Sequence, residues 1–425
     1  MKPHIGIFQA YWPLQVHTVN SVLMLAQAGY GVDLFIYRVY EGHVSDQLDQ
    51  LRNMLDVRVH SFGALKNCTS ALRTRDAVAQ AIWKRTSRMP SPLRAIFMFV
   101  SILRQRLLLW FNRDPGMLPK VLVRETRHIL EDKRCKALIG IEKRGLIWAG
   151  QVAKQLGIPY LYHSLELYTR EYPGFATSIS AMRMKLTEEK YHKSSYATII
   201  QDERRAEVLF RDNGVQEGTP IYVPVSLLGK PFKERSSYLQ EKFLIKRDQK
   251  IILQLGIIHE DRYSIELARL AQDFPVDWVL VLHGAGQESS IRNVQEVDMR
   301  SRVILSTEMA SSMQLQQVVA SAHIGLAFYQ ASSANDYLTA HSSEKIALYL
   351  QCGLPVIAFE YPGYDLLERH RCGVLIKTLQ ELPQAIEKIL KSYNEFSSNA
   401  KECFIEYYEF SKNYRKVIEV LDQLP

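Results

Sequence analysis

The sequence has few cysteines, and their spacing argues against two ways in which cysteines stabilise a fold. The five cysteines are Cys68, Cys135, Cys352, Cys372 and Cys403, and no two of them form a CxxC pair. An odd number without paired spacing argues against a disulfide framework and against a zinc cluster. A reduced, cytosolic setting is therefore the expectation.

Several motifs of known chemistry are also missing. The sequence contains no HExxH, no Asp-x-Asp and no Cys/His cluster, so no metal site is expected. It contains no GxxxxGK[ST], which argues against a P-loop kinase. The opening MKPHIGIFQAYWP has no long apolar run, so we expect no secretory signal.

Length and composition indicate a globular protein of more than one domain. A chain of 425 residues exceeds one typical core. Hydrophobic residues make up 47% and charged residues 23%, which is neither disordered nor fibrous. The net charge of +8 fits anionic partners such as nucleotides, membrane lipids or nucleic acid, without choosing among them.

The chain opens with the pattern of a βαβ unit. Apolar runs at residues 4–8 and 32–37 flank a segment of helical periodicity, residues 18–28, which ends at Gly29. Further strand-like runs lie at residues 137–141, 160–162, 197–200, 251–255, 276–283, 303–305, 324–328 and 355–359. Helical patterns separate them, for example residues 147–156, which end at Gly157. Strands that alternate with helices predict parallel sheets. The charged stretch 224–250 is predicted to be a linker with one short helix.

The most informative segment is SSEKIALYLQCGLPVIAF, residues 342–359. A Ser-Ser pair opens a helix with an apolar face, Gly353 ends it, and a buried parallel strand follows. A helix N-terminus carries free amide donors and the positive end of the helix dipole, so it suits a phosphate. An ordinary α/β crossover would need the same glycine and strand, and that alternative stays open.

This order of parts resembles the donor-binding segment of GT-B glycosyltransferases, in particular the family-4-like group (glycosyltransferase group 1). The resemblance implies an α/β fold of two Rossmann-like, doubly wound domains facing a cleft. Residues 1–225 would bind the acceptor, and residues 226–403 would bind the nucleotide sugar. A C-terminal helix, 404–425, would pack back on the first domain. The nucleotide sugar is a substrate, so no cofactor is expected, and metal-dependent GT-A chemistry is disfavoured.

The resemblance assigns a diphosphate site to ILQLGIIHEDRY, residues 252–263. Gly256 ends a strand, and Arg262 aligns with a family lysine that binds the diphosphate. Ile257 stands in place of a family arginine, and His259 is a partial replacement for that cation. The alternative for Arg262 is a solvated charge at a helix start.

The helix start of residues 342–359 departs from the family pattern. Ala340 and Leu348 stand where many members have two glutamates, so the ribose-binding and sugar-binding carboxylates are missing. The donor-binding candidates there are Ser342, Ser343, Glu344 and Lys345. The alternative for Glu344 and Lys345 is a capping pair in the first helical turn.

Residues 157–168, GIPYLYHSLELY, supply the catalytic candidates. His163 follows a Gly-Ile-Pro strand, as a family histidine near the donor sugar does, and would hydrogen-bond a sugar hydroxyl. Glu166 is the second candidate, with Glu171 close by, because a glutamate can accept a proton from an acceptor hydroxyl. A histidine satisfied by backbone at a strand end is the alternative for His163.

Residues 66–136 form a basic insert with 16 Lys and Arg against 5 Asp and Glu, a charge of +11 that exceeds that of the whole chain. Within it, residues 93–111 place Arg94, Ser101, Arg104 and Gln105 on one narrow helical face, with mostly apolar residues elsewhere. The segment is too polar to span a membrane and suits a helix in an anionic membrane interface. A core helix with snorkelling arginines is the alternative. The apolar share argues against nucleic acid.

Taken together, the patterns predict a glycosyltransferase that moves a sugar from a nucleoside-diphosphate donor to an acceptor hydroxyl. By family it would be retaining and metal-independent, and would serve surface polysaccharide or glycolipid synthesis. The expected location is the cytoplasm, including the inner face of the membrane. Two alternatives remain: a sugar-nucleotide 2-epimerase on the same fold, and a non-catalytic nucleotide-sugar-binding protein.

Overall fold

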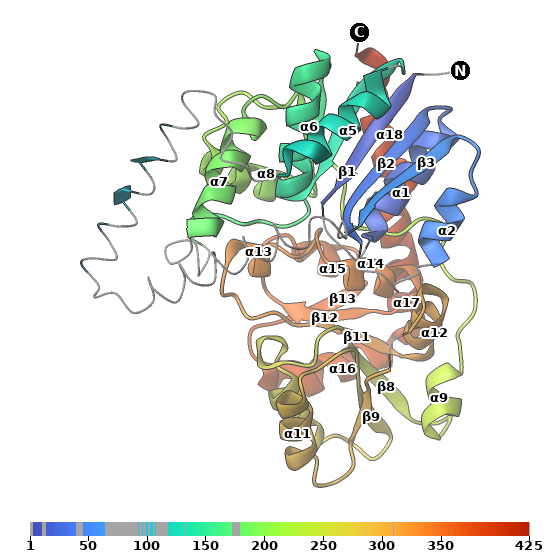
Figure 1. The fold of residues 1–425 in the computed structure, drawn as a ribbon. Helices are drawn as coiled ribbons and strands as arrows, with labels where there is room; N and C mark the ends of the chain where they lie inside the picture. The colour runs from blue at the N-terminus through green and yellow to red at the C-terminus, as the bar shows by residue number, and fades with distance from the viewer. Residues whose placement is uncertain are drawn as a thin grey trace. The chain divides into compact units, whose positions relative to one another are not determined.

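The computed structural model divides the chain into two compact units (Figure 1). It describes residues 3–10, 14–39, 46–63, 118–131, 133–171, 179–308 and 310–424, with isolated positions between 92 and 107. The first unit comprises Met1–Val223 and Tyr414–Pro425, and the second comprises Pro224–Asn413. Each unit is built on one parallel sheet.

The sheet of the first unit has seven strands in the order β3-β2-β1-β4-β5-β6-β7. Its strands are β1 (His4–Gln9), β2 (Gly31–Val39), β3 (Val57–Gly63), β4 (Cys135–Ile141), β5 (Tyr160–His163), β6 (Ala197–Ile200) and β7 (Pro220–Tyr222). The first six follow the Rossmann order, in which the chain reverses direction across the sheet between β1 and β4. Ligands of such sheets bind at that switch point, beyond the carboxyl ends of the strands.

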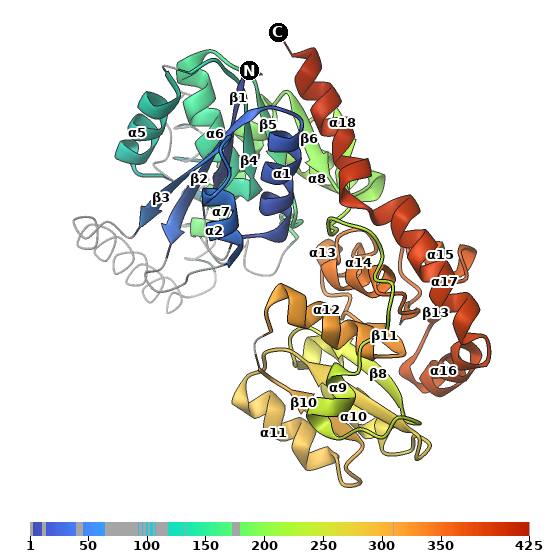
Figure 2. The same ribbon diagram turned by 90° about the vertical axis from the view of Figure 1, so that its right-hand side faces the viewer.

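Helices connect and cover these strands. They are α1 (Val16–Gln27), α2 (Asp46–Arg52), α5 (Lys120–Glu131), α6 (Glu142–Leu156), α7 (Ile179–His192), α8 (Glu203–Asn213) and α18 (Phe410–Gln423). The Asp202 side chain accepts from the Arg205 amide and so caps the start of α8. Near the C-terminus, Asp422 accepts from the Tyr30 hydroxyl and its carbonyl accepts from Lys136, which ties α18 to this unit (Figure 2).

The core of the first unit depends on close packing of α6 against the sheet. Gly145 lies so near β1 that a Cβ there would be 2.3 Å from the Phe8 carbonyl oxygen. Because glycine permits this approach, Trp148 on the next turn reaches Phe8 and Phe35, with ring centroids 5.1 and 6.2 Å away. The side chain of Trp148 is fully buried.

The sheet of the second unit has six strands in the Rossmann order β10-β9-β8-β11-β12-β13. They are β8 (Lys250–Leu255), β9 (Trp278–His283), β10 (Val303–Ser306), β11 (Ile324–Ala327), β12 (Val356–Phe359) and β13 (Gly373–Ile376). Neighbouring strands of this sheet run parallel to each other. The switch point of this sheet lies between β8 and β11.

Two apolar layers cover the two faces of this sheet. One contains buried residues of α9 (Tyr238–Phe243), α12 (Ser312–Ser321), α14 (Glu344–Gln351), α17 (Tyr393–Cys403) and the π-helix η3 (Phe404–Tyr408). The other contains buried residues of α10 (Ser264–Ala271), α11 (Glu288–Val297) and α16 (Leu382–Lys391). The short elements η1 (Glu260–Arg262), α13 (Ala334–Tyr337), α15 (Asp365–Arg369) and η2 (Leu379–Glu381) complete the unit.

The predicted fold class, two Rossmann-like doubly wound units, is confirmed. The structure differs from the sequence predictions in detail. Helix α6 begins at Glu142, earlier than the predicted 147, and the predicted C-terminal helix is interrupted at Glu409, between η3 and α18. In the part of the chain that the structure describes, no helix combines the length and the apolar character needed to cross a membrane.

Candidate functional site

The second unit has a pocket of about 380 Å³ beyond the carboxyl ends of β8, β9 and β10. Its lining combines strand-end residues with the first turn of α14: Leu255, Gly256, Ile257, His283, Gly284, Ala285, Thr307, Glu308, Ala310, Leu315, Glu344, Lys345 and Leu348. A pocket at the carboxyl edge of a Rossmann sheet, beside a helix N-terminus, suits a phosphorylated ligand.

Two glycines keep the wall of this pocket open. Gly256 and Gly284 have φ of 118° and 145°, which disfavour any residue with a side chain. A Cβ on Gly284 would lie 2.0 Å from the Gly256 carbonyl oxygen, and a Cβ on Gly256 would lie 3.6 Å from the Lys345 ammonium. The two turns therefore pack backbone to backbone, and Lys345 extends from α14 toward β8.

A pair of cations meets one aromatic ring next to the pocket. The Lys345 ammonium lies 4.4 Å from the centre of the Tyr329 ring, and the Arg262 guanidinium carbon lies 4.8 Å from it. Tyr329 follows β11, so the sheet's switch point brings the ends of β8 and β11 together around these charges. Two cations near one phosphate-sized space can neutralise a diphosphate.

The proximity of the two cations affects the protonation of Lys345. Desolvation of its ammonium, followed by the charge of Arg262, lowers the pKa of Lys345 to about 7. A lysine in this state gains a full charge when an anion binds beside it. Neighbouring Glu344 has an exposed side chain that also lines the pocket.

The two serines before α14 make hydrogen bonds inside the second unit. The Ser343 hydroxyl lies 2.6 Å from the Tyr329 hydroxyl, and the Ser342 hydroxyl donates to the Leu338 carbonyl. Ser343 is the N-cap residue of α14, yet its side chain does not cap the helix. The backbone amides of both serines donate to the Thr339 carbonyl, so a phosphate here would depend on the amides of the first turn of α14 and not on the serines.

His259 and Asp336 show local roles near Arg262. The His259 ring accepts from the Asp261 amide and caps η1. Asp336 accepts from the hydroxyls of Ser332 and Ser333, and one of its oxygens lies 3.9 Å from the Arg262 guanidinium. The predicted contact of His259 with a diphosphate stays a prediction.

In the first unit, the predicted catalytic histidine ends β5 at the carboxyl edge of the sheet. His163 is fully buried, and its two ring nitrogens have no hydrogen-bond partner among the described residues. Its ring centre lies 5.7 Å from that of His17 on α1. Burial lowers the pKa of His163 to about 3, so the imidazole is neutral at physiological pH. A neutral imidazole can hydrogen-bond a hydroxyl but is not poised to act as a strong base.

The second catalytic candidate lies three residues further on. The Glu166 side chain is exposed, and its backbone amide donates to the carboxylate of Glu142, 2.8 Å away. Glu171 is exposed as well. The structure thus places His163 and Glu166 on one strand end and the loop after it.

The basic insert lies largely outside the described residues, including Arg94, Arg106 and the two tryptophans Trp83 and Trp110. The described positions show one feature. Ile96, Phe99, Val100, Leu103 and Leu107 are helical and between 45 and 68% exposed. Their spacing of three and four residues places them on one helical face. Arg104 in the same segment is exposed as well.

Some residues of these sites were not predicted from the sequence. Tyr329 was missed, although an aromatic residue directly after a buried strand was a usable signal. Glu142 was missed because EKRG, residues 142–145, has the composition of a turn. In the described part of the chain, no group of three or more His, Cys, Asp and Glu side chains is arranged to hold a metal ion.

Comparisons with known proteins show which proteins this chain resembles. Residues 277–406 match the family model of the C-terminal domain of glucosyltransferase 3-like proteins. A search of curated proteins finds no match. Among solved structures, HepE from Anabaena in complex with UDP is similar over 99% of this chain and 100% of its own, with a TM-score of 0.65 and 13% identity.

Two further structures share the fold. Sucrose-phosphate synthase from Thermosynechococcus elongatus has a TM-score of 0.64 and 15% identity, covering 100% of this chain and 99% of its own. WaaG, a glycosyltransferase involved in lipopolysaccharide biosynthesis, has a TM-score of 0.58 and 13% identity, covering 99% of each chain. The predicted GT-B fold is confirmed over the whole chain, and the match of residues 277–406 to a glucosyltransferase family model supports the predicted glycosyltransferase.

Proposed function

We propose that this GT-B glycosyltransferase takes a sugar from a nucleoside-diphosphate sugar and transfers it to an acceptor hydroxyl. The donor's diphosphate binds in the second unit, between the first turn of α14 and the cations Arg262 and Lys345. The observation that carries the proposal is the pair of cations at the Tyr329 ring, 4.8 and 4.4 Å from its centre, beside a glycine-lined pocket. Uridine nucleotides are the first to test, since HepE was solved with UDP and with UDP-glucose.

The same charges support the chemical step. When the bond between sugar and phosphate breaks, the departing diphosphate gains negative charge, and fixed positive charges stabilise it. Arg262, Lys345 and the positive end of α14 supply that charge without a metal ion. The resemblance to family 4 implies retention of configuration at the anomeric carbon. The first unit, with His163 and Glu166, is assigned to the sugar and the acceptor.

The proposed acceptor belongs to a surface polysaccharide or a glycolipid, and the basic insert brings the protein to an anionic membrane surface. The exposed apolar face of Ile96, Phe99, Val100, Leu103 and Leu107 supports this assignment. The charge of +11 over residues 66–136 complements anionic headgroups. An apolar face within a basic segment is the arrangement of helices that lie in a membrane interface.

Calorimetry with UDP and the full chain tests the donor assignment. Arg262→Ala should weaken UDP binding by roughly 1–3 kcal/mol, the range for a charge-assisted hydrogen bond. Arg292→Ala is the matched control, because Arg292 is an exposed arginine paired to Glu288 on α11. Equal affinities of wild type and Arg262→Ala, with the fold intact, would contradict the proposed site.

A second measurement separates an enzyme from a binding protein. Nucleotides that co-purify with the chain can be identified by mass spectrometry, and the matching nucleotide sugar can then be offered as donor. Slow release of free sugar and UDP is expected even without an acceptor. Tight donor binding with no hydrolysis and no transfer would instead support the non-catalytic alternative.

A further inference from the structure

Glu142 has a backbone conformation that is rare for a residue with a side chain. It follows β4 directly, at the switch point of the first sheet, and its φ is 59°. Residues other than glycine avoid this left-handed region, and one that adopts it is held there by its surroundings. Such positions cluster at functional sites, where the strain is part of the mechanism.

The buried Glu142 carboxylate binds the loop that carries the catalytic candidates. One of its oxygens accepts from the backbone amides of Leu165 and Glu166, at 2.6 and 2.8 Å. These amides lie two and three residues after His163. The side chain of Glu142 is only 5% exposed, so both hydrogen bonds are shielded from water.

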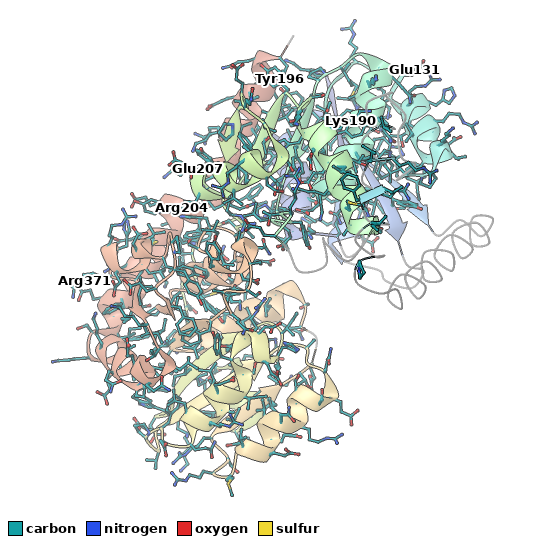
Figure 3. All side chains as sticks on the ribbon, turned by 90° about the vertical axis from the view of Figure 1, so that its left-hand side faces the viewer. Glu131, Lys190, Tyr196, Arg204, Glu207 and Arg371 are labelled. Carbon is teal, nitrogen blue, oxygen red and sulfur yellow. The ribbon has the colours of Figure 1, made fainter. Side chains whose placement is uncertain are left out.

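Two side chains near the start of α8 hold the carbonyls of the same loop. Gln201 donates to the Ser164 carbonyl at 2.6 Å, and Arg205 donates to the Leu165 carbonyl at 2.8 Å. Arg205 also donates to the Gln201 side chain at 2.6 Å. Arg204 and Glu207 of α8 are exposed (Figure 3), whereas Arg205 is fully buried.

The titratable groups that interact with Glu142 come from several parts of the first unit. Glu166 lies on the loop, Lys143 follows on α6, Tyr162 is on β5 and Arg205 is on α8. Burial, followed by repulsion from Glu166, raises the pKa of Glu142 to about 7. An acid whose pKa is higher in the folded than in the unfolded state destabilises the fold as pH rises between the two values. The ionised carboxylate therefore costs stability at pH 8.

From these contacts we infer that Glu142, with Gln201 and Arg205, positions the loop of His163 and Glu166 for glycosyl transfer. The inference rests on the proposed function. We call the hydrogen bonds of Glu142, Gln201 and Arg205 to this loop the clamp. The clamp fixes the peptide groups on both sides of Leu165, and with them the direction in which the Glu166 side chain leaves the backbone.

Two substitutions of Glu142 in the full chain separate positioning from folding. Glu142→Ala removes the acceptor, so we expect kcat to fall at least tenfold and the Leu165 and Glu166 amides to lose protection from hydrogen exchange. Glu142→Gln retains a neutral acceptor, so it should restore most of the protection and of kcat. The KM for the donor should be unchanged in both variants. Glu207→Gln, on the exposed face of α8, is the control with wild-type kinetics.

The pH profile adds a readout that a structural role alone would not change. Glu142 titrates near pH 7 and Glu142→Gln does not, so any step in the wild-type kcat profile near pH 7 should be absent from Glu142→Gln, and the two proteins should have similar kcat below pH 7. The melting temperature of Glu142→Gln at pH 8 should equal or exceed that of wild type. Wild-type kcat and an unchanged pH profile in both variants would overturn the inference.

Two other outcomes, a variant that does not fold and a wild type without activity, call for different measurements. If Glu142→Ala does not fold, Gln201→Ala takes its place. It removes the bond to the Ser164 carbonyl and the bond that Arg205 donates to Gln201, and it should lower kcat without changing the donor KM. If wild type transfers no sugar from any donor, the proposed function fails. Hydrogen exchange of residues 165 and 166 in Glu142→Gln and Gln201→Ala then still decides whether the clamp exists.

Discussion

The ammonium of Lys345 lies 4.4 Å from the centre of the Tyr329 ring, and the Tyr329 hydroxyl lies 2.6 Å from that of Ser343. One tyrosine thus contacts both a cation in the first turn of α14 and the residue that precedes the helix. The Tyr329 ring therefore holds the Lys345 ammonium in place next to the N-terminus of α14. We expect this arrangement to control how the second unit binds an anion.

Lys345 should make nucleotide binding depend on pH. Its pKa in the free protein is about 7, so at pH 8 or 9 the anion must bind together with a proton. Affinity for UDP should be constant below pH 7 and fall by up to tenfold per pH unit above it. Calorimetry in buffers of different ionisation enthalpy measures the proton uptake directly.

Lys345→Arg is the matched control for this prediction. Arginine keeps its charge throughout this range, so its UDP affinity should lack the decline above pH 7. Any titration of UDP itself is shared by both proteins and cancels. The same slope in wild type and Lys345→Arg would show that Lys345 is not the titrating group.

His163 should matter for turnover and little for stability. His163→Ala removes a neutral ring whose nitrogens have no partner among the described residues, so kcat should fall while UDP affinity stays unchanged. The control is His192→Ala, because His192 bonds to Thr198 and Asn213 at 2.8 Å each. Leaving those partners unsatisfied should cost about 2 kcal/mol more in the free energy of unfolding.

Denaturant unfolding and kinetics of the two histidine variants together check this assignment. Full activity in His163→Ala would reject its role at the sugar. A loss of stability equal to that of His192→Ala would show that His163 serves the core.

Asp33 should stabilise the first unit against acid. Its fully buried carboxylate lies 3.0 Å from His4, 2.8 Å from His60 and 2.5 Å from Lys133. Burial would raise its pKa, but the hydrogen bonds of His60 and Lys133 and the charges of Lys133 and Arg58 outweigh burial and lower it to about 2. The folded pKa is below the unfolded value of 3.8, so this contribution is complete above pH 4 and is lost as pH falls through 2. It amounts to about 2 kcal/mol.

Asp33→Asn should therefore lower the free energy of unfolding at pH 7 by at least that amount. The loss of stability between pH 4 and pH 2 should also become shallower than in wild type. Asp49→Asn is the control, because Asp49 forms an exposed pair with Arg52. Equal unfolding curves for wild type and Asp33→Asn would show that the cluster contributes nothing.

The apolar face of the basic insert should mediate membrane binding. Vesicles that contain phosphatidylglycerol should retain the protein at low salt and release part of it at high salt, because salt screens the headgroup attraction. The triple variant Ile96→Glu, Phe99→Glu, Leu103→Glu should not be retained, since three charges replace the apolar contact. Vesicle sedimentation measures both.

A control with the same chemistry places three glutamates at exposed apolar positions elsewhere. Leu55, Val276 and Met299 are 101, 76 and 89% exposed, and their triple glutamate variant should bind vesicles like wild type. If both triple variants lose vesicle binding, the loss is due to the change in net charge and not to the apolar face. Wild type that ignores anionic vesicles would leave the apolar face without a membrane role.

Much of the fold could be predicted because buried parallel strands are short apolar runs closed by characteristic turns. The expected strand at 197–200 has the bounds of β6, and the predicted helix ends at Gly29, Gly157 and Gly353 show φ of 87, 68 and 73°. The strands that were not predicted, β3, β7 and β13, all lie at sheet edges. An edge strand has one neighbour, so it needs fewer apolar residues, and β3 carries Arg58 and His60 toward Asp33.

The residue types of the proposed donor site can be read from the amino-acid sequence: the glycine after a buried strand at Gly256, and the two cations Arg262 and Lys345. Their meeting at the Tyr329 ring, and the hydrogen bonds of Glu142 to the loop after His163, could be found only in the folded chain. This is because the order of strands in a parallel sheet differs from their order along the chain. Long crossovers place β11 beside β8 and β4 beside β1, so residues distant in sequence meet at one sheet edge.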